Sequence, residues 1–245
     1  MIAKLVEIQQ VDILAIGAHP DDVEVGVGGM LHKFSKSGLH TGILDLTRGE
    51  LGTRGTVEER AVEAGEAAAV LGAVQRANAA LPDGGLADTH EQRQAVIPFI
   101  RAFAPRVIIA PFDADRHPDH EAAHHLARNA NYLAGLSRID TDQPPHRATQ
   151  LYYYRVYGDS TPPQIIVNIS EEFEVKMKAL QAHRSQFHNP DYAGSPTYVS
   201  SEGFWNSIQT RSEYWGQRIG VAHAETLYAL EPLAIDSLPG IEPST

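Results

Sequence analysis

Cysteine is absent from this 245-residue sequence, and its absence narrows the chemistry that is open to the chain. Without thiols there are no disulfides and no thiolate metal sites, so His, Asp and Glu remain as the metal-binding side chains. Basic residues are scarce as well, because 20 Lys and Arg stand against 31 Asp and Glu, for a formal net charge of -11. This charge argues against nucleic acid or an anionic membrane as a partner.

Long apolar runs are also missing. No stretch approaches the roughly 18 consecutive apolar residues that a membrane span needs. The first residues, MIAKLVEIQQVD, lack the apolar core and cleavage site of a secretory signal. We therefore expect a cytoplasmic protein. Its length suits one α/β domain, and its 42% content of hydrophobic residues is ordinary for a globular fold.

Short apolar runs alternate with helix-like segments along the first half of the chain. The runs at Val11–Gly17, Thr41–Leu46 and Arg106–Ala110 predict buried strands, and segments such as Val57–Leu71 predict helices. This alternation indicates a Rossmann-like, mostly parallel sheet with helices on both faces. The loops that follow the strands then share one edge of the sheet, where ligands bind in such folds. The other predicted elements here are a strand at Arg76–Leu81 and helices at Gly26–Ser37, Gln92–Phe103 and Asp119–Leu133.

The second half of the chain is less regular. Leu151–Tyr157 and Gln164–Ile169 predict strands, interpreted as a pair, and Ser170–Arg184 and Ser201–Gln217 predict helices. Gly220–Leu230 is not placed in any element. We expect a single domain over 1–245, in which 1–140 carry a Rossmann-like part with a metal site, 141–235 complete the cleft and 236–245 form a loose tail.

The stretch VDILAIGAHPDDVEVGVGG, residues 11–29, ends a predicted strand in the polar cluster His19, Asp21 and Asp22. His is the commonest metal ligand among side chains, and carboxylates complete sites of this kind. Adjacent residues in an extended turn point in different directions, so one carboxylate can hold a metal while the other faces a bound water. Pro20 disfavours a helical conformation at His19, which therefore marks the end of the strand.

A second polar cluster, DADRHPDH, occupies residues 113–120. His117 and His120 share a face at a helix start, where proline is tolerated in the first turn. With His19 and Asp22, His120 completes a two-His, one-carboxylate set, which is the open arrangement of catalytic zinc. Asp21 is then placed to act as a general base. The same donors suit ferrous iron, so Zn²⁺ and Fe²⁺ both remain candidates.

Several of these features also have structural interpretations. An HPD tripeptide alone most often forms a turn, and it is the combination of two clusters at strand ends that favours a metal site. Gly26, Gly28 and Gly29 lack the spacing of a dinucleotide-binding loop, and we interpret them as positions of close helix packing. Arg60, beside acidic residues of its own helix, fits a solvated ion-pair face. A non-catalytic module that holds a metal or a nucleotide is the alternative supported by fold class and glycines alone.

The motifs AHPDDVEVGVGG and DADRHPDH together resemble the PIG-L/LmbE-type zinc-dependent deacetylases, which remove N-acetyl groups from N-acetylglucosamine derivatives. The similarity extends to LTRGELGTRGT, LPDGGL, SQFHNP and WGQRIGVAHAE, and it is closer to the bacillithiol-biosynthesis branch. It implies hydrolysis of N-acetylglucosaminyl malate, with another N-acylated sugar or a small amide as the alternative substrate. It also implies a homo-oligomer, either a trimer or a hexamer.

The resemblance implies roles for the matching residues. The implied zinc ligands are His19, Asp22 and His120. Asp21 is the implied general base, and His117 would stabilise the oxyanion with Asp119 as its orienting partner. Some relatives carry a tyrosine in a late active-site loop, where this sequence is aligned with Phe204. That alignment leaves oxyanion stabilisation to His117 and the metal.

Substrate contacts are expected from a further set of residues. Arg60 and Asp83 match positions that contact the sugar in similar proteins, and Arg116 is expected to reach the acyl group or the sugar. Arg48 and Arg54 are assigned to a malate carboxylate from charge complementarity alone.

Overall fold

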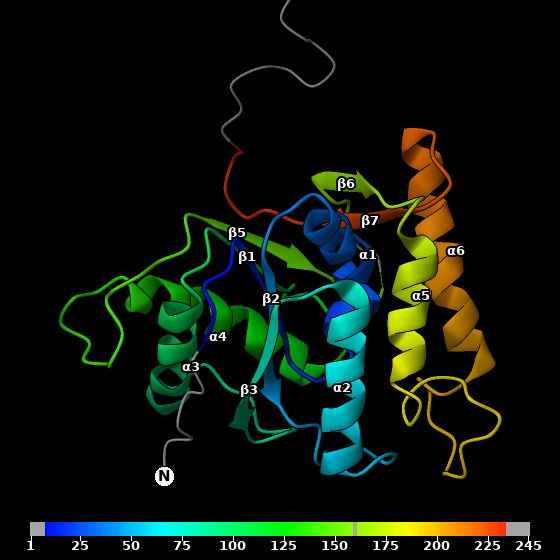
Figure 1. Ribbon diagram of the computed structural model, residues 1–245, viewed down its shortest axis with the longest axis horizontal. Helices are drawn as coiled ribbons and strands as arrows, with labels where there is room; N and C mark the ends of the chain where they lie inside the picture. Colours follow the sequence, from blue (N-terminus) through cyan, green and yellow to red (C-terminus); the bar gives the residue numbers. More distant parts are fainter. Residues whose placement is uncertain (1–7, 159–160, 234–245) are drawn as a thin grey trace, which may run out of the picture.

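The computed structural model describes residues 8–158 and 161–233 (Figure 1). A five-stranded parallel sheet forms its centre, in the order β3-β2-β1-β4-β5. Its strands are β1 (Ile13–Gly17), β2 (Thr41–Thr47), β3 (Gln75–Leu81), β4 (Val107–Pro111) and β5 (Gln150–Tyr154). The predicted α/β, Rossmann-like class is confirmed, and every strand expected in the first half of the chain is present.

Helices cover both faces of this sheet (Figure 1). On one face lie α1 (Asp22–Lys36), α2 (Val57–Leu71), α5 (Phe173–Ala182) and α6 (Glu202–Ile219), and on the other lie α3 (His90–Phe103) and α4 (Pro118–Ala134). Leu14 and Ile16 of β1 pack toward α3 and α4, whereas Ile13 and Ala15 pack toward α1 and α2. Because β1, β2 and β4 are buried on both sides, they read as largely apolar runs, whereas the edge strands β3 and β5 are only partly buried.

The smaller C-terminal part contains the expected strand pair, but with different members. β6 (Ile165–Asn168) pairs in antiparallel fashion with β7 (Ala224–Leu227). The prediction that 151–157 and 164–169 pair with each other is wrong, because β5 instead joins the parallel sheet beside β4. Strand propensity is local, whereas the choice of a partner depends on packing.

Helix α1 differs from its predicted form in a way that affects the site. It begins at Asp22, ahead of the expected start at Gly26, and it is broken at Val27, where φ is -141° and ψ is 19°. The interpretation of the glycines as positions of close packing is confirmed for Gly26 and Gly29, whereas a Cβ on Gly28 would meet ordinary contacts, the nearest at 3.5 Å. A Cβ on Gly26 would lie 2.0 Å from the Tyr154 ring, and one on Gly29 would lie 2.7 Å from Ile169.

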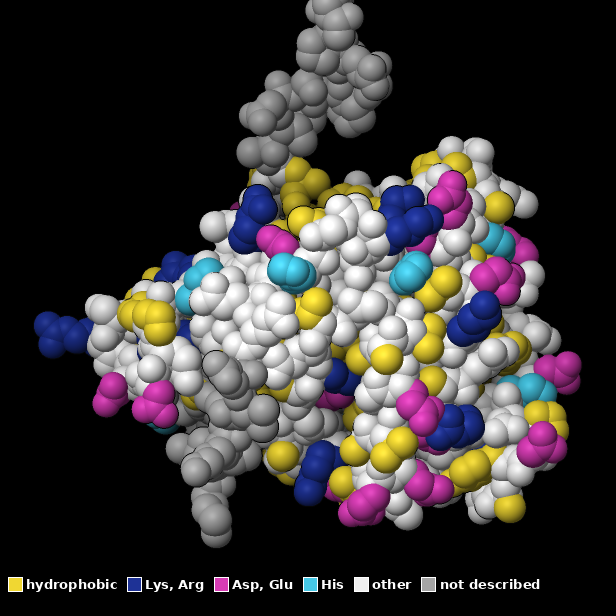
Figure 2. All heavy atoms as spheres, in the orientation of Figure 1, with side chains coloured by type: hydrophobic (Ala, Val, Ile, Leu, Met, Phe, Trp, Pro, Cys, Tyr) yellow, Lys and Arg dark blue, Asp and Glu magenta, His cyan; other side chains and the backbone are white. Residues whose placement is uncertain are grey.

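The lengths of the helices and the distribution of surface charge are two further features of the whole fold. Across residues 8–158 and 161–233, no helix combines the length and the apolar character needed to cross a membrane. On the face shown in Figure 2, Lys and Arg side chains are scattered among acidic ones rather than gathered in one basic patch. The predicted loose tail, 236–245, lies outside the described residues.

Candidate active site

A cleft of about 380 Å³ lies where the parallel strands end, between the loops that follow them and the segment 186–199. It is the edge of the sheet at which α/β folds bind ligands. Eight of the residues singled out from the sequence line it: His19, Asp21, Asp22, Arg60, Asp83, Arg116, His117 and His120. The two motifs, about a hundred positions apart, therefore meet in one site, as expected.

Asp22 lies between the imidazoles of His19 and His120. Its Oδ2 is 3.4 Å from Nδ1 of His19, and its Oδ1 is 3.2 Å from Nε2 of His120. The side chains of Asp22 and His120 are only 5% and 1% exposed. Two imidazoles and one carboxylate are donors that zinc and ferrous iron accept, and Asp22 contacts both rings directly.

Further metal-binding groups surround this centre. The ring nitrogens of His19, His117 and His120 lie within 4.8 Å of one another, and so do ligand atoms of His19, Asp83 and Asp119. His19 belongs to both groups, because its Nε2 is 3.1 Å from Asp83 Oδ1 and 3.3 Å from Asp119 Oδ2. The structure thus adds two carboxylates that face His19.

Asp21 occupies a strained position at the start of α1. Its φ of 136° lies in a region that residues other than glycine rarely adopt, and such strain is concentrated at functional sites. Burial raises the pKa of Asp21 to about 6, against the opposing charge of Arg60, whose Nη2 is 3.4 Å from Asp21 Oδ2. A carboxylate with a pKa closer to neutrality is a stronger general base.

Arg60 connects two of the loops that form the site. Its side chain is 5% exposed, so the interpretation as part of a solvated ion-pair face is wrong. Its Nη1 donates to Gly49 O at 2.9 Å, and its Nη2 donates to Pro20 O at 3.1 Å. Gly49 has φ 67°, and a Cβ there would lie 1.8 Å from Arg60 Nη1, so only glycine allows this contact. Arg60 thereby ties the loop after β2 to the turn that carries Asp21.

His117 caps the N-terminus of α4. Its Nδ1 accepts a hydrogen bond from the Asp119 backbone N–H at 3.2 Å, so the proton of the neutral ring lies on Nε2. Burial and the neighbouring His19 and His120 lower the pKa of His117. The Asp119 carboxylate does not orient this ring. It faces His19 and accepts the Gly84 N–H at 2.8 Å, because the first turn of α4 directs it toward the loop after β3.

Asp115 is a site residue that the sequence motifs alone did not single out. Its Oδ2 is 3.2 Å from Nδ1 of His120, and its side chain is 1% exposed. The same oxygen accepts the backbone N–H groups of Val156 and Tyr157. Histidines that bind a metal commonly present their other ring nitrogen to a carboxylate. The motif DADRHPDH contained this acid, but the spacing alone does not distinguish Asp115 from Asp113.

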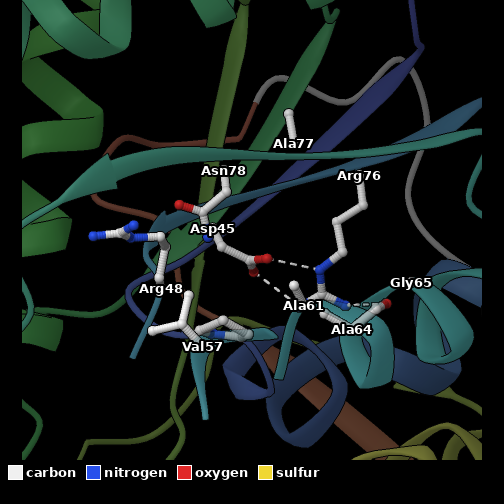
Figure 3. A pocket seen from close by; sticks show the side chains of 10 residues that line it. Asp45, Arg48, Val57, Ala61, Ala64, Gly65, Arg76, Ala77 and Asn78 are labelled. Carbon is white, nitrogen blue, oxygen red and sulfur yellow. Dashed lines mark hydrogen bonds and ion pairs between the residues drawn. The ribbon is translucent and has the colours of Figure 1, made fainter. Parts of the chain in front are cut away.

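Two arginines expected at the substrate lie elsewhere. Arg54 is 7% exposed, and its Nε donates to Ser185 O at 2.6 Å. Arg48 lines a separate cavity between α2 and the sheet, where Figure 3 shows its guanidinium directed away from the ion pair of Asp45 and Arg76. Their positions do not support contacts with a substrate in the cleft. Both assignments rested on charge alone, and the charge of a residue does not indicate where its side chain points in the fold.

Arg116, by contrast, reaches into the cleft. Its guanidinium lies against the rings of both Tyr157 and Tyr198, 4.5 Å and 4.0 Å from their centroids. Within the described part of the chain, no hydrogen bond or ion pair engages this guanidinium, so its N–H donors remain open. Tyr198 is also one of the late-loop residues that line the cleft, whereas Phe204 is buried with 5% exposure and packs against the Tyr198 ring.

Comparisons with known proteins agree with this arrangement. Residues 14–131 match the family described as PIG-L, GlcNAc-PI de-N-acetylase. The chain is 29% identical over 228 residues to diacetylchitobiose deacetylase of Thermococcus kodakarensis, covering 87% of this chain and 80% of that protein. It is 31% identical over 192 residues to the uncharacterised deacetylase YaiS of Escherichia coli, covering 71% and 90%. The crystal structure of the conserved protein TT1542 from Thermus thermophilus shares 39% identity and a TM-score of 0.84, covering 96% and 100%. This chain belongs to the PIG-L family.

Proposed function

We propose that this protein is a metal-dependent deacetylase that hydrolyses the N-acetyl group of an N-acetylglucosamine derivative. The observation that carries the proposal is the position of Asp22 between His19 and His120, with Asp21 beside it in the same cleft. Two of its relatives carry the name deacetylase, and deacetylases are hydrolytic enzymes. The fold alone would suit a non-catalytic module equally well, but such a module has no need of a strained, buried carboxylate beside a metal site.

Each residue of the cleft has a distinct chemical task in this proposal. His19, Asp22 and His120 would hold the ion, either zinc or ferrous iron. When bound, such an ion polarises an acyl carbonyl and lowers the pKa of a coordinated water to about 7. Asp21 accepts the proton of the attacking water and returns it to the departing amine.

His117 stabilises the oxyanion of the tetrahedral intermediate by donating a hydrogen bond from Nε2. It does so as a neutral ring, because its Nδ1 already accepts the Asp119 N–H and its pKa is lowered. A positively charged imidazole is therefore not required.

For the substrate, we infer N-acetylglucosaminyl malate. The open guanidinium of Arg116, held by cation–π contacts with two tyrosine rings, suits two-point binding of a carboxylate. In this proposal Arg116, rather than Arg48 or Arg54, binds the malate carboxylate. Asp83, which also lines the cleft, would bind a sugar hydroxyl. A role in bacillithiol biosynthesis, a trimeric or hexameric assembly and a cytoplasmic location form part of the same proposal.

Metal-resolved turnover tests this function. Protein loaded with zinc or iron is assayed for amine release from N-acetylglucosaminyl malate and from N-acetylglucosamine. We expect Asp21→Asn to keep the metal and to lose activity by about 10²- to 10⁴-fold, the usual contribution of a general base. His120→Ala should lose both metal and activity, and Asp113→Asn, in the same motif but outside the cleft lining, should lose neither.

Two outcomes would contradict parts of this proposal. A zinc-loaded protein that releases no amine from either substrate would overturn the deacetylase function. If Asp21→Asn empties the site while Asp22→Asn remains loaded, the roles of the two carboxylates are reversed.

A further inference from the structure

The break in helix α1 separates the residues of the cleft from the rest of that helix. The first segment, residues 22–26, carries Asp22 at its start, and the helical conformation is interrupted at Val27. A helical segment of little more than one turn is not stable by itself, because its few hydrogen bonds do not offset the entropy of nucleation. Contacts from other elements must therefore hold this segment and the carboxylate that it carries.

A buried ion pair fills the break. Nζ of Lys176, on α5, lies 2.6 Å from Oε1 of Glu225, on β7, and both side chains are 3% exposed. Lys176 also donates to Val25 O at 2.8 Å. Glu225 accepts the N–H of Gly29 at 3.0 Å and that of Met30 at 2.7 Å. In an unbroken helix, the Gly29 N–H would donate to Val25 O. Lys176 thus binds the carbonyl of that missing backbone hydrogen bond, and Glu225 binds its N–H.

The signs of the two charges match the ends of the two helical segments. The C-terminal end of a helix carries partial negative charge and the N-terminal end partial positive charge. Lys176 faces the Val25 carbonyl in the last turn of the first segment, and Glu225 faces the N–H groups of Gly29 and Met30 in the first turn of the second. Arg211, on α6, adds a weaker donor to Val25 O at 3.4 Å. Three elements from the last third of the sequence therefore join the two halves of α1.

We propose that the Lys176–Glu225 pair is a positioning element of the candidate site, which holds the break at Val27 so that the first segment of α1 presents Asp22 between the two imidazoles. Neither residue lines the cleft, so both act through the backbone of α1. The inference rests on the proposed function for its kinetic consequence, whereas its consequence for metal binding can be measured separately.

Amide hydrogen exchange on the unaltered protein provides the first test, because coupling between two sites is reciprocal. If the pair positions Asp22, zinc binding must in turn stabilise the junction at Val27. We expect exchange at Gly29 and Met30 to slow by about 10-fold or more when zinc is added to metal-free protein, while Ser37 and Gly38 change by less than about 2-fold. Equal exchange at Gly29 and Met30 with and without zinc would overturn the proposal.

A double variant provides the second test. K176M/E225Q removes both charges together, so that neither is left buried without a partner. We expect it to fold, as judged by circular dichroism, and to bind zinc about 10-fold more weakly or worse in competition with a chelator, as for other residues that support metal ligands indirectly. The matched control R184M/E66Q removes an exposed ion pair and should keep the wild-type affinity. A folded K176M/E225Q with wild-type affinity would contradict the positioning role.

Failure of the proposed function would look different. If the wild-type protein binds zinc but releases no amine, the deacetylase function is overturned, and the two zinc measurements still decide the positioning role. If the wild type is active, we expect K176M/E225Q with saturating zinc to lower kcat while KM changes less than about 3-fold, because neither residue touches the substrate. A rise in KM with unchanged kcat would contradict positioning of Asp22. If K176M/E225Q does not fold, the exchange measurement decides.

Discussion

The cleft at the strand ends and the cavity beneath α2 both contain buried charges, yet these charges are satisfied in different ways. In the cavity of about 290 Å³, Nε and Nη2 of Arg76 donate to the two carboxylate oxygens of Asp45 (Figure 3). Nη1 of the same arginine donates to Glu24 of α1. In the cleft, Arg116 contacts two tyrosine rings, and Asp22 is shared between two imidazoles. The buried charges of Arg76, Asp45 and Glu24 are neutralised within the protein, whereas the exposed Arg116 of the cleft keeps N–H donors open to a ligand.

The two hollows differ less in volume, about 380 Å³ for the cleft and about 290 Å³ for the cavity, than in how their charged groups are satisfied. The cavity has largely apolar walls, and it lies where α2 faces the sheet, on the side seen in Figure 2. Its ion pair nonetheless supports the fold, since Glu24 belongs to the first segment of α1. Open hydrogen-bonding capacity at the ends of the strands distinguishes the site from the cavity.

Removing Arg76 should produce the largest effect on stability. We expect Arg76→Met to lower the free energy of unfolding by about 3–5 kcal/mol, because Asp45 loses its buried partner and Glu24 loses one of its two, keeping His183. Urea unfolding followed by circular dichroism measures this change. Arg48→Met, at an exposed arginine of the same cavity, should stay within about 0.5 kcal/mol of wild type. If Arg76→Met also stays within about 0.5 kcal/mol of wild type, the ion pair of Arg76 and Asp45 does not support the fold.

The deficit of Arg76→Met should also depend on pH. Burial raises the pKa of Asp45 even with Arg76 present. A carboxyl whose pKa is raised in the folded state stabilises that state when protonated, and this contribution is lost as the pH rises through the raised pKa. Without Arg76 the pKa rises further, so the deficit should shrink as the pH falls from about 7 to about 5. A constant deficit over this range would mean that Asp45 stays ionised in the variant.

An intermediate effect is expected at the carboxylate behind His120. Asp115→Asn should weaken zinc binding by about 10- to 100-fold, because the Nδ1 side of the ring loses its charged partner. Chelator competition on the metal-free variant measures this affinity, with Asp113→Asn as the control from the same loop. Unchanged affinity in Asp115→Asn would show that the 3.2 Å contact does not orient His120.

The smallest effect is expected at Arg116 and concerns only the substrate. Arg116→Met should raise KM by about 10-fold for N-acetylglucosaminyl malate, the scale of a charged hydrogen bond, and by less than about 2-fold for N-acetylglucosamine. Steady-state kinetics on both substrates measure the difference, and Arg48→Met serves as the control arginine outside the cleft. If KM rises equally for the two substrates, Arg116 does not bind the carboxylate. The contrast between open donors in the cleft and paired charges in the cavity would then have no functional meaning.

The ligand candidates could be found from the sequence because each is encoded locally. A strand, a proline and a polar turn follow one another directly at His19, and the pattern of parallel strands places this turn at the same edge as His120. Arg54 shows where such reasoning stops. Its charge suggested a substrate contact, but its Nε is bonded to Ser185 O, 131 residues away, and nothing near Arg54 in the sequence indicates that partner.

The placement of strands shows the same limit. The parallel sheet follows from apolar runs of sufficient length, each of which carries its own propensity. β7 was missed because it is only four residues long and is defined by its pairing with β6, some sixty positions earlier in the chain. The break in α1 was not anticipated either, because the residues that stabilise it lie on α5, α6 and β7.

Residue types and their spacing were sufficient to establish the α/β class, the nitrogen and oxygen donors of the candidate site, and the edge of the sheet at which they meet. The folded chain alone shows that Asp115 lies against His120, that Arg116 rather than Arg54 enters the cleft, and that Glu225 caps an amide 196 positions earlier. The reason is that burial and hydrogen-bond partners determine whether a charged group is neutralised or open to a ligand. Those partners come from segments that only folding brings together.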